Sequence, residues 1–593
     1  MRMSQKLEEV NKLFPCVFMR EFLKYFLMKV SKYTWIFILI FCIGIFFRVY
    51  HFGDWLQFKG DAFRDAILIS NVYDTGVASL PLLGPRAGGT MLRLGPVFYD
   101  FQYIATQIFQ SVDTVVLAYP DLFFSILTLP LFFFFVRRYF SQGWSLLLML
   151  FLAVSFLAIE YGRFAWNPNS VLFFTLIFSF AVLSLYEKKE GGHQLLWASV
   201  AGLSLAIASQ LHFSAFLGLP IVLLLFIVWN VKQSKQVLTF RVVSIFFLCL
   251  GIVYLPVFIS EFFKHGENAR LFLSAISSKS SSNGLLLNIY QDLHMFAKYF
   301  ARILIGLVEP SKWIILLGGL FCGLGLLANA FLLRSETDEK KQHFLKWSLL
   351  LIVVYFFLYI PLAFKIDRPR FYLPFMVVPF LYFGYMCRAL DKKGWFVKYR
   401  IFLFSLGIII IAGSNVIATL GWFSELRNSQ ETATSTGERN SKGRSYFLTW
   451  GHFERTAEVI ERSCEKENNI YFQMAKNIKA YDHSIEYALL MKKRSWESTL
   501  QSTEQTMQGG CYYYISFVKE VLPDYLLTTK RDTPVDVGNL NIVRVYPEGE
   551  ALEKFRERKI TVERMQEQKI FEPEKITRYS RVFWGDVWYR LNK

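Results

Sequence analysis

Metal-ligand spacing is absent from this 593-residue sequence. It holds eight histidines and seven cysteines, and no H-x-x-x-H or C-x-x-C pair occurs among them, so no zinc site is predicted. A divalent metal therefore has no support from spacing, and no other cofactor is implied. Charged residues make up only 19% of the chain. No internal repeat is visible either, and such repeats are common in membrane transporters.

Apolar residues dominate the composition instead. Hydrophobic residues form 54% of the chain and aromatic residues 18%, with 61 phenylalanines. Apolar runs of about 18 residues recur, and runs of that length require lipid, so a polytopic membrane protein is predicted. The net charge of +18 is then explained by loops and headgroup contacts, and nucleic acid is not an expected partner. The first run lacks a small-residue cleavage site after it and is predicted to remain as an anchor.

The predicted fold class is mainly α, with about eleven transmembrane helices and a small C-terminal α/β domain. The N-terminus is predicted to be cytoplasmic, because this orientation places the basic loops inside. Two further apolar stretches, 96–110 and 288–308, are predicted to be juxtamembrane or re-entrant helices. Counting 96–110 as a span would move Arg137 and Arg138 outside. The spans are predicted at 33–50, 115–136, 143–160, 169–186, 194–210, 213–230, 240–262, 312–333, 347–364, 371–390 and 399–421.

Four parts are predicted along the chain. A basic cytoplasmic segment, 1–32, precedes a membrane domain at 33–421 that carries a long outer loop, 51–114. Residues 422–443 are predicted to be a linker rich in small polar residues. The segment 444–593 is predicted to be an α/β domain on the outer side of the cytoplasmic (inner) membrane, without a Walker or nucleophile-elbow motif. Its helical pattern lies at 453–463 and its strand patterns at 469–472, 511–517 and 541–546.

An acidic pair stands just beyond the first predicted span, in the stretch KGDAFRDA at residues 59–66. If Asp61 opens a short helix, Asp61 and Asp65 share one face and Arg64 flanks them. Charge at the edge of a bilayer costs free energy and is usually functional, so these three residues are the predicted catalytic group. The alternative is an interfacial helix that lies on the headgroups with its charges solvated.

Proline-containing turns on the predicted outer face supply a second set of candidates. Arginine suits a phosphate partner, because the guanidinium makes planar bidentate contacts with it. The alternative is that these cations only anchor span ends in lipid headgroups. The candidates for phosphate binding are Arg163, Lys365, Arg368, Arg370 and Tyr372. Arg93, Asn167 and His212 are candidates for an acceptor or sugar site, although a lone histidine at a helix boundary is more often a hydrogen-bonded interface residue.

Two cysteines, Cys464 and Cys511, fall in the predicted outer domain. Each lies near the start of a predicted strand, and an oxidising compartment favours a bridge between them. A disulfide is therefore predicted, closing a loop of about 47 residues. The alternative is two buried free thiols.

The order of these pieces resembles the GT-C superfamily of membrane glycosyltransferases, and in particular the protein mannosyltransferase and aminoarabinose transferase family (glycosyltransferase family 39) of bacterial type. The resemblance covers residues 33–420 and leaves the C-terminal domain uncovered. The segments that carry it are GDAFRDA at 60–66, LGPVFY at 94–99, RFAWNP at 163–168, LPVF and EFFKHG at 255–258 and 261–266, and RFYLP at 370–374.

The resemblance implies transfer of a sugar from a polyprenyl-phosphate carrier to an envelope acceptor, which is a protein, a lipid or a glycan. Asp61 would then act as general base or orient the acceptor hydroxyl. Many family members follow this aspartate with a glutamate, whereas this chain has Ala62. The leaving group would be a lipid phosphate, which needs cations more than an acid.

Two other classes of protein remain open at this point. A transporter or flippase of a lipid-linked or anionic substrate would also be polytopic, but transporters usually place ionisable residues near the bilayer midplane. Here the charges gather at one face. A non-catalytic envelope scaffold would leave Asp61 replaceable.

Overall fold

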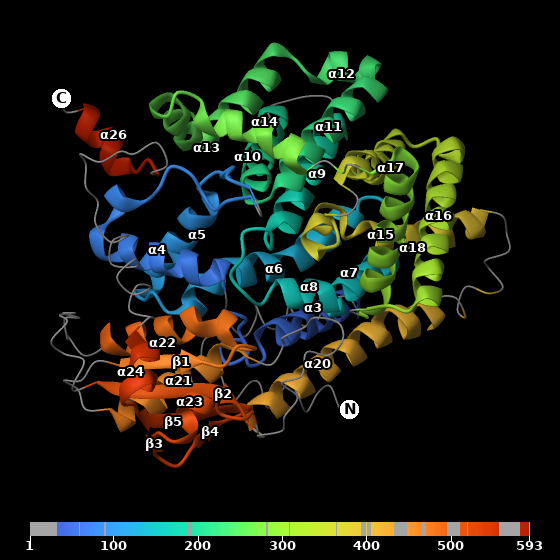
Figure 1. Ribbon diagram of the computed structural model, residues 1–593. Coiled ribbons are helices and arrows are strands. Elements are labelled where there is room, and N and C mark those ends of the chain that lie inside the picture. Colours follow the sequence, from blue (N-terminus) through green and yellow to red (C-terminus); the bar gives the residue numbers. More distant parts are fainter. Residues whose placement is uncertain are drawn as a thin grey trace, which may run out of the picture.

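The computed structural model describes residues 32–591 with gaps at 59, 88–89, 188–192, 280, 282, 308, 363–364, 393–398, 400–401, 403–404, 432–447, 465–469, 495–509, 519 and 557–580. The basic segment 1–32 therefore lies almost wholly outside the described residues. The described chain forms a large helical part and a smaller sheet-containing part below it (Figure 1).

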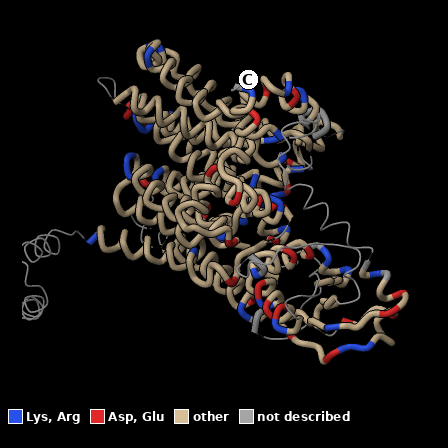
Figure 2. Tube along the Cα trace, turned by 90° about the vertical axis from the view of Figure 1, so that its left-hand side faces the viewer, with Lys and Arg blue, Asp and Glu red and all other residues tan. Residues whose placement is uncertain are grey.

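Each predicted span is mainly helical over the residues that the structure describes. Eight helices in the described part of the chain are long and apolar enough to cross a membrane, and the count is nine if α11 and α12, which bend by 103° relative to each other, form one span. The other two predicted spans correspond to α7 (Gln142–Val154) and α9 (Val171–Glu187), which are shorter than a straight crossing requires. The protein is thus a multi-pass membrane protein, and Figure 2 shows long uncharged stretches through its helices.

The other helical elements of the large part, long and short, are α3 (Lys32–Val49), α6 (Thr114–Val136), α8 (Phe156–Tyr161), α10 (His193–Leu211), α11 (Phe213–Trp229), α12 (Val231–Val237), α13 (Phe240–Phe263), α14 (Glu267–Lys279), α15 (Leu285–Ile305), α16 (Lys312–Ser335), α17 (Glu339–Tyr359), η2 (Ile360–Leu362), η3 (Pro369–Phe371), η4 (Leu373–Phe375), α18 (Val378–Lys392), η5 (Ile408–Gly413) and α20 (Ser414–Glu431). The helix α10 packs between α9 and α13. Close approach at this point needs Gly202, where an added Cβ would lie 2.3 Å from the Phe246 carbonyl oxygen.

The long loop after α3 is mostly ordered as short elements. It contains α4 (Asp61–Thr75), η1 (Val77–Ser79) and α5 (Val97–Phe109). The two helices α4 and α5 pack together, and α5 also packs on α6. Helix α5 occupies the stretch 96–110 that was predicted to be a juxtamembrane helix, and α15 occupies the stretch 288–308.

The C-terminal part contains a mixed five-stranded sheet, as the strand patterns predict. The strand order is β1-β2-β5-β3, with β4 also paired to β5, and only the β1–β2 pair is parallel. Hydrogen bonds attach this part to the outer loop: Trp450 donates its backbone N–H to the Leu56 carbonyl at 2.8 Å, and the Ser484 hydroxyl donates to the Phe58 carbonyl at 2.8 Å. The elements are α21 (Trp450–Ser463), β1 (Ile470–Met474), η6 (Lys479–Tyr481), α22 (Asp482–Arg494), β2 (Cys511–Phe517), α23 (Asp524–Leu527), β3 (Lys530–Arg531), β4 (Val535–Val537), β5 (Leu540–Tyr546) and α24 (Gly549–Arg556).

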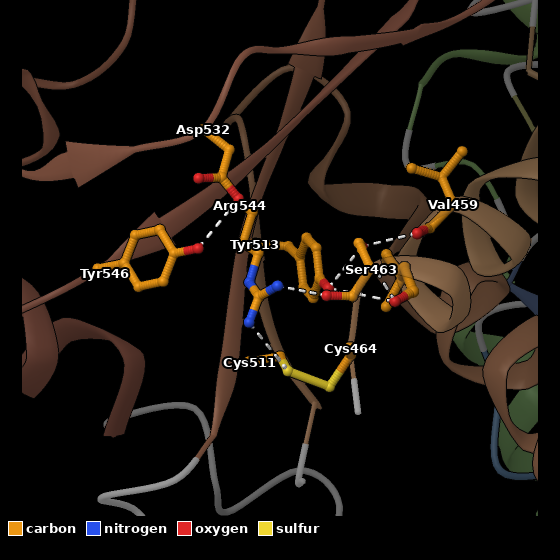
Figure 3. The surroundings of a disulfide bond; sticks show 9 residues. Val459, Ser463, Cys464, Cys511, Tyr513, Asp532, Arg544 and Tyr546 are labelled. Atoms are coloured by element: carbon orange, nitrogen blue, oxygen red, sulfur yellow. Dashed lines mark hydrogen bonds between the residues drawn. A yellow bond between two sulfur atoms is a disulfide. The ribbon is translucent and has the colours of Figure 1, made fainter. Parts of the chain in front are cut away.

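A disulfide joins Cys464, at the end of α21, to Cys511, the first residue of β2 (Figure 3). Their Cα atoms are 5.8 Å apart. The Arg544 side chain on the neighbouring strand donates to the Ser463 carbonyl and lies 3.8 Å from the Cys511 sulfur. The bridge therefore fastens the helix α21 to the centre of the sheet.

The last helix, α26 (Trp584–Leu591), leaves the sheet-containing part. Figure 1 shows it beside α13, across α4 and α5 from the sheet. The backbone N–H of Leu82 donates to the Val582 carbonyl at 2.9 Å, and that of Trp584 donates to the Leu80 carbonyl at 3.2 Å. Val582 and Val587 are buried against Leu82. This C-terminal segment is thus attached to the middle of the loop 51–114.

Candidate active site

A cavity of about 720 Å³ lies where the outer loop meets the turns between later helices. Its volume falls within the usual range for small-molecule sites. Six of the residues predicted from the sequence line it together, namely Asp61, Arg64, Asn167, His212, Lys365 and Arg370. They come from separate segments of the chain, so the fold brings one acidic group and several basic groups to a single hollow.

The acidic side of the cavity is the first turn of α4. Gly60 has a φ of 51° and redirects the chain into the helix, in a conformation that favours glycine. Asp61 occupies the first helical position, where the helix dipole favours negative charge. Its side chain is 57% exposed, and its Oδ1 accepts a hydrogen bond of 2.9 Å from Arg64.

Asp65 lies one turn further along α4 and is buried. It accepts two hydrogen bonds from Arg64, at 2.9 and 3.1 Å, and one of 2.8 Å from the Tyr99 hydroxyl. Burial acts to raise the pKa of the Asp65 carboxyl, and the Arg64 guanidinium and the Tyr99 hydroxyl act against it. Burial, together with the negative charge of Asp65, raises the pKa of Tyr99, which stays a neutral donor. Asp65 was predicted to belong to the catalytic group, but it does not line the cavity. Its hydrogen bonds hold the Arg64 side chain in position.

The basic side of the cavity is the link between η2 and η3. Arg370 lies over the Trp166 ring, with its guanidinium carbon 5.1 Å from the ring centroid. The link itself is held from α15, because Lys298 donates to both carboxylate oxygens of Asp367 at 2.9 and 3.1 Å, and the Tyr299 hydroxyl donates to it at 3.1 Å. These contacts fix the segment that presents Lys365 and Arg370.

Two polar residues complete the wall between the acidic and basic sides. The Asn167 amide donates to the Leu211 carbonyl at 2.5 Å. The His212 Nδ1 lies 2.6 Å from the Ser214 hydroxyl and accepts from the Ser214 backbone N–H at 3.2 Å, which caps α11. Both side chains are largely buried. Their hydrogen bonds fix the α10–α11 corner, and each still presents part of its surface to the cavity.

Arg163 is placed away from the cavity, against the expectation of a phosphate contact. It is buried, and its guanidinium donates to the carbonyls of Phe47, Arg48 and Tyr50 at 2.8 to 3.0 Å. A helix end leaves such carbonyls without intrahelical partners, and a cation there is favourable. The role that the structure gives Arg163 is therefore to close the C-terminus of α3.

Three other predicted residues also lie outside this cavity. Tyr372 is fully buried and stacks on Tyr299, with ring centroids 3.9 Å apart, so it is part of the packing of η3 and η4 on α15. Arg368 is exposed and does not line the cavity. Arg93 lines a smaller adjoining cavity instead. In the described ranges, no group of three His, Cys, Asp or Glu side chains could hold a metal ion.

Residues 73–266 match the family model described as Dolichyl-phosphate-mannose-protein mannosyltransferase. This segment, about a third of the chain, is similar to that family of membrane glycosyltransferases. The matched segment holds Tyr99, Asn167 and His212, whereas Asp61 precedes it and Arg370 follows it. No curated protein matches the sequence.

Solved structures of membrane glycosyltransferases are also similar to this chain. ArnT from Cupriavidus metallidurans, bound to undecaprenyl phosphate, is 11% identical with a TM-score of 0.48, over 87% of this chain and 98% of that one. The apo oligosaccharyltransferase of Archaeoglobus fulgidus is 12% identical with a TM-score of 0.45, over 83% of this chain and 70% of that one. The latter enzyme is also similar in a form tethered to an acceptor peptide with an NVT sequon. At these TM-scores the similarities assign no role to any residue.

Sequence reasoning assigned no role to several residues of the site. Tyr99 and Trp166 stand inside motifs that carry the family resemblance, yet nothing local shows that they support Asp65 and Arg370. Asp367 stands two residues before Pro369 in the basic link, which was a usable signal. No signal in the sequence marked Lys298, which holds Asp367 of a distant segment, or Arg86, which lines the cavity.

Proposed function

We propose that this glycosyltransferase moves a sugar from a polyprenyl-phosphate carrier to an acceptor of the cell envelope, on the outer face of the cytoplasmic membrane. The observation that carries the proposal is the shared cavity, in which the exposed carboxylate of Asp61 lies in one hollow with Lys365 and Arg370. Glycosyl transfer from a lipid phosphate needs a group that takes a proton and cations that receive a phosphate. The cavity supplies both.

In the proposed reaction the acceptor hydroxyl attacks the anomeric carbon of the sugar and gives its proton to Asp61. The bond between that carbon and the phosphate oxygen breaks, and the electron pair leaves with the carrier phosphate. Lys365 and Arg370 stabilise the phosphate as its charge grows. Arg64 occupies Oδ1 of Asp61, and among the described residues no hydrogen bond reaches Oδ2, which is the oxygen we assign to the acceptor.

The test is carrier-phosphate release by the purified full chain with polyprenyl-phosphate sugars. Asp61→Asn keeps the shape of the side chain but cannot accept the proton, and we expect a loss of about 10² to 10⁴ in rate. Asp74→Asn is the matched control, because Asp74 is an exposed carboxylate on the same helix and does not line the cavity. Near-normal transfer by Asp61→Asn would reject the assignment.

The outer placement of the C-terminal part belongs to the same proposal. The Cys464–Cys511 bridge supports it, because disulfides persist in oxidising compartments. Basic loops between the spans support it through the positive-inside rule. Protease added to intact spheroplasts should remove the C-terminal part, and its protection until the membrane is permeabilised would contradict this orientation.

A further inference from the structure

A second, smaller cavity of about 90 Å³ adjoins the first. Arg86 and Met91 line both, so the two hollows share a wall. The smaller one has several times the space that a water molecule needs, which suits a phosphate or carboxylate group and excludes a sugar ring. Ser260, which is 1% exposed, lines it with a hydroxyl that has no hydrogen-bond partner among the described residues.

Three arginines from three places in the sequence converge on this small cavity. Arg86 and Arg93 face each other across an isolated antiparallel bridge, and Arg581 comes from the C-terminal segment. In the part of the chain that the structure describes, none of the three forms a salt bridge with a carboxylate. Burial and the positive charges of Arg581 and Arg86 lower the pKa of Arg93 to about 10. Like charges held this close cost free energy unless an anion joins them.

The smaller cavity is also lined by acidic side chains, which do not neutralise the positive charge of the arginines. Glu261 and Glu267 line the same cavity together with Lys264. The charge of Glu267 acts to raise the pKa of Lys264 against the effect of burial, so these two groups already interact. Glu261 accepts a hydrogen bond of 3.0 Å from the Ala269 backbone N–H. With four cationic and two anionic side chains at the wall, the cavity keeps a positive balance.

Arg581 is placed by the attachment of the chain end. The segment pairs with the outer loop through the Pro81–Phe583 bridge and through the hydrogen bonds of Val582 and Trp584 described above. The Arg581 guanidinium lies 5.5 Å from the centroid of the Tyr99 ring and donates to the Tyr99 hydroxyl at 3.4 Å. One hydrogen-bonded chain therefore runs from Asp61 through Arg64, Asp65 and Tyr99 to Arg581.

We propose that Arg86, Arg93 and Arg581 form a second anion-binding subsite, which receives a phosphate or carboxylate group carried by the acceptor or by the transferred sugar. The proposal rests on the function proposed above, in which Lys365 and Arg370 already receive the carrier phosphate. The rest of the bound molecule lies in the larger cavity, and its anionic group reaches past Arg86 into the smaller one. The C-terminal segment thus contributes directly to substrate recognition.

A binding measurement tests the subsite without relying on transfer. Full-length protein in detergent is titrated with inorganic phosphate by calorimetry, in wild type and in Arg581→Met, which keeps the apolar stem over Tyr99 and removes the charge. Loss of a charged donor should weaken one phosphate-binding event about tenfold or more. Arg581→Lys should restore part of it. Arg590→Met should not change it and is the control, because Arg590 lies in α26, just after Arg581, with its guanidinium over Phe263.

Arg370→Ala alters the larger cavity. It should leave phosphate binding in the smaller cavity intact and remove phosphate binding at Lys365 and Arg370. Phosphate binding by Arg581→Met that equals wild type would overturn the proposal. If Arg581→Met does not fold, Arg93→Met takes its place with the same expectations. Failure of all variants and of wild type to transfer sugar would reject the proposed function, while the calorimetry would still decide the subsite.

Transfer assays then identify which molecule carries the anion. With anionic and neutral acceptors compared at one donor, Arg581→Met should raise KM about tenfold for the anionic acceptor only if the group is on the acceptor. If the anionic group is on the sugar, Arg581→Met should raise KM about tenfold for an acidic sugar donor and not for a neutral one. Equal KM changes for charged and neutral substrates in both series would contradict charge recognition by this subsite.

Discussion

Exchange of Asp65 for asparagine should separate stability from catalysis at the centre of the site. The carboxylate is 2% exposed, receives two hydrogen bonds from Arg64 and receives a third from Tyr99. Breaking a buried ion pair costs about 3–5 kcal/mol, but the Arg64 side chain is 37% exposed and solvent replaces part of the loss. We therefore expect Asp65→Asn to lower the free energy of unfolding by about 1–3 kcal/mol.

Asp61→Asn should show the opposite pattern. Its ion pair with Arg64 joins side chains that are 57% and 37% exposed, and exposed pairs contribute about 0–1 kcal/mol. Stability should hardly change while transfer is lost. Thermal unfolding in detergent and carrier-phosphate release, measured on both variants, give the comparison. If Asp65→Asn kept full stability and lost transfer as completely as Asp61→Asn does, Asp65 would be the reacting carboxylate and the reasoning would fail.

Three further predictions concern the basic side and the outer domain. Arg370→Ala should raise KM for the donor more than Arg370→Lys, because lysine keeps the charge and loses only the planar fork. Equal effects of the two changes would contradict a contact between Arg370 and the donor phosphate. Asp367→Asn should weaken donor binding by releasing the link from Lys298, and Lys298→Met should do the same without an additive effect in the double variant. Replacing Cys464 and Cys511 by serine should destabilise the C-terminal part by about 3–4 kcal/mol on the chain-entropy model, measured by its rate of proteolysis. Of the seven cysteines, the bridge leaves five as thiols, so seven titratable thiols in denatured, unreduced wild type would contradict it.

The order of the apolar runs predicted which loops lie on the same side of the membrane. This explains why residues predicted from separate loops line one cavity. Asp61 follows the first apolar run and Arg370 precedes a later one, so the predicted topology puts both on one side of the membrane, and the two line one cavity. The strands β2 and β5 were predicted for a similar reason, since short β-branched and aromatic runs between turns have few other solutions. Patterns of this kind depend on neighbouring residues in the chain.

The direction of a side chain within a turn depends on what packs above it, and here the sequence was insufficient. Arg163 and Arg370 both stand in proline-containing turns, yet one closes the end of α3 and the other lines the cavity. The attachment of Arg581 beside Tyr99 was likewise invisible, because it joins residues almost five hundred positions apart. The predicted linker at 422–443 shows the same limit, since α20 continues through its first ten residues to Glu431 and 432–447 lie outside the described ranges.

The attachment of the chain end to the outer loop also sets an order in time. Arg581 follows Asp61 by 520 positions, and synthesis at about 5–20 residues per second separates them by on the order of half a minute to two minutes. Throughout that interval Tyr99 and Arg93 lack the guanidinium that lies beside them in the finished fold. The second cavity can close only after the C-terminal segment has been made and has attached to the loop, so a nascent or truncated chain carries the carboxylate of the site without its complete wall.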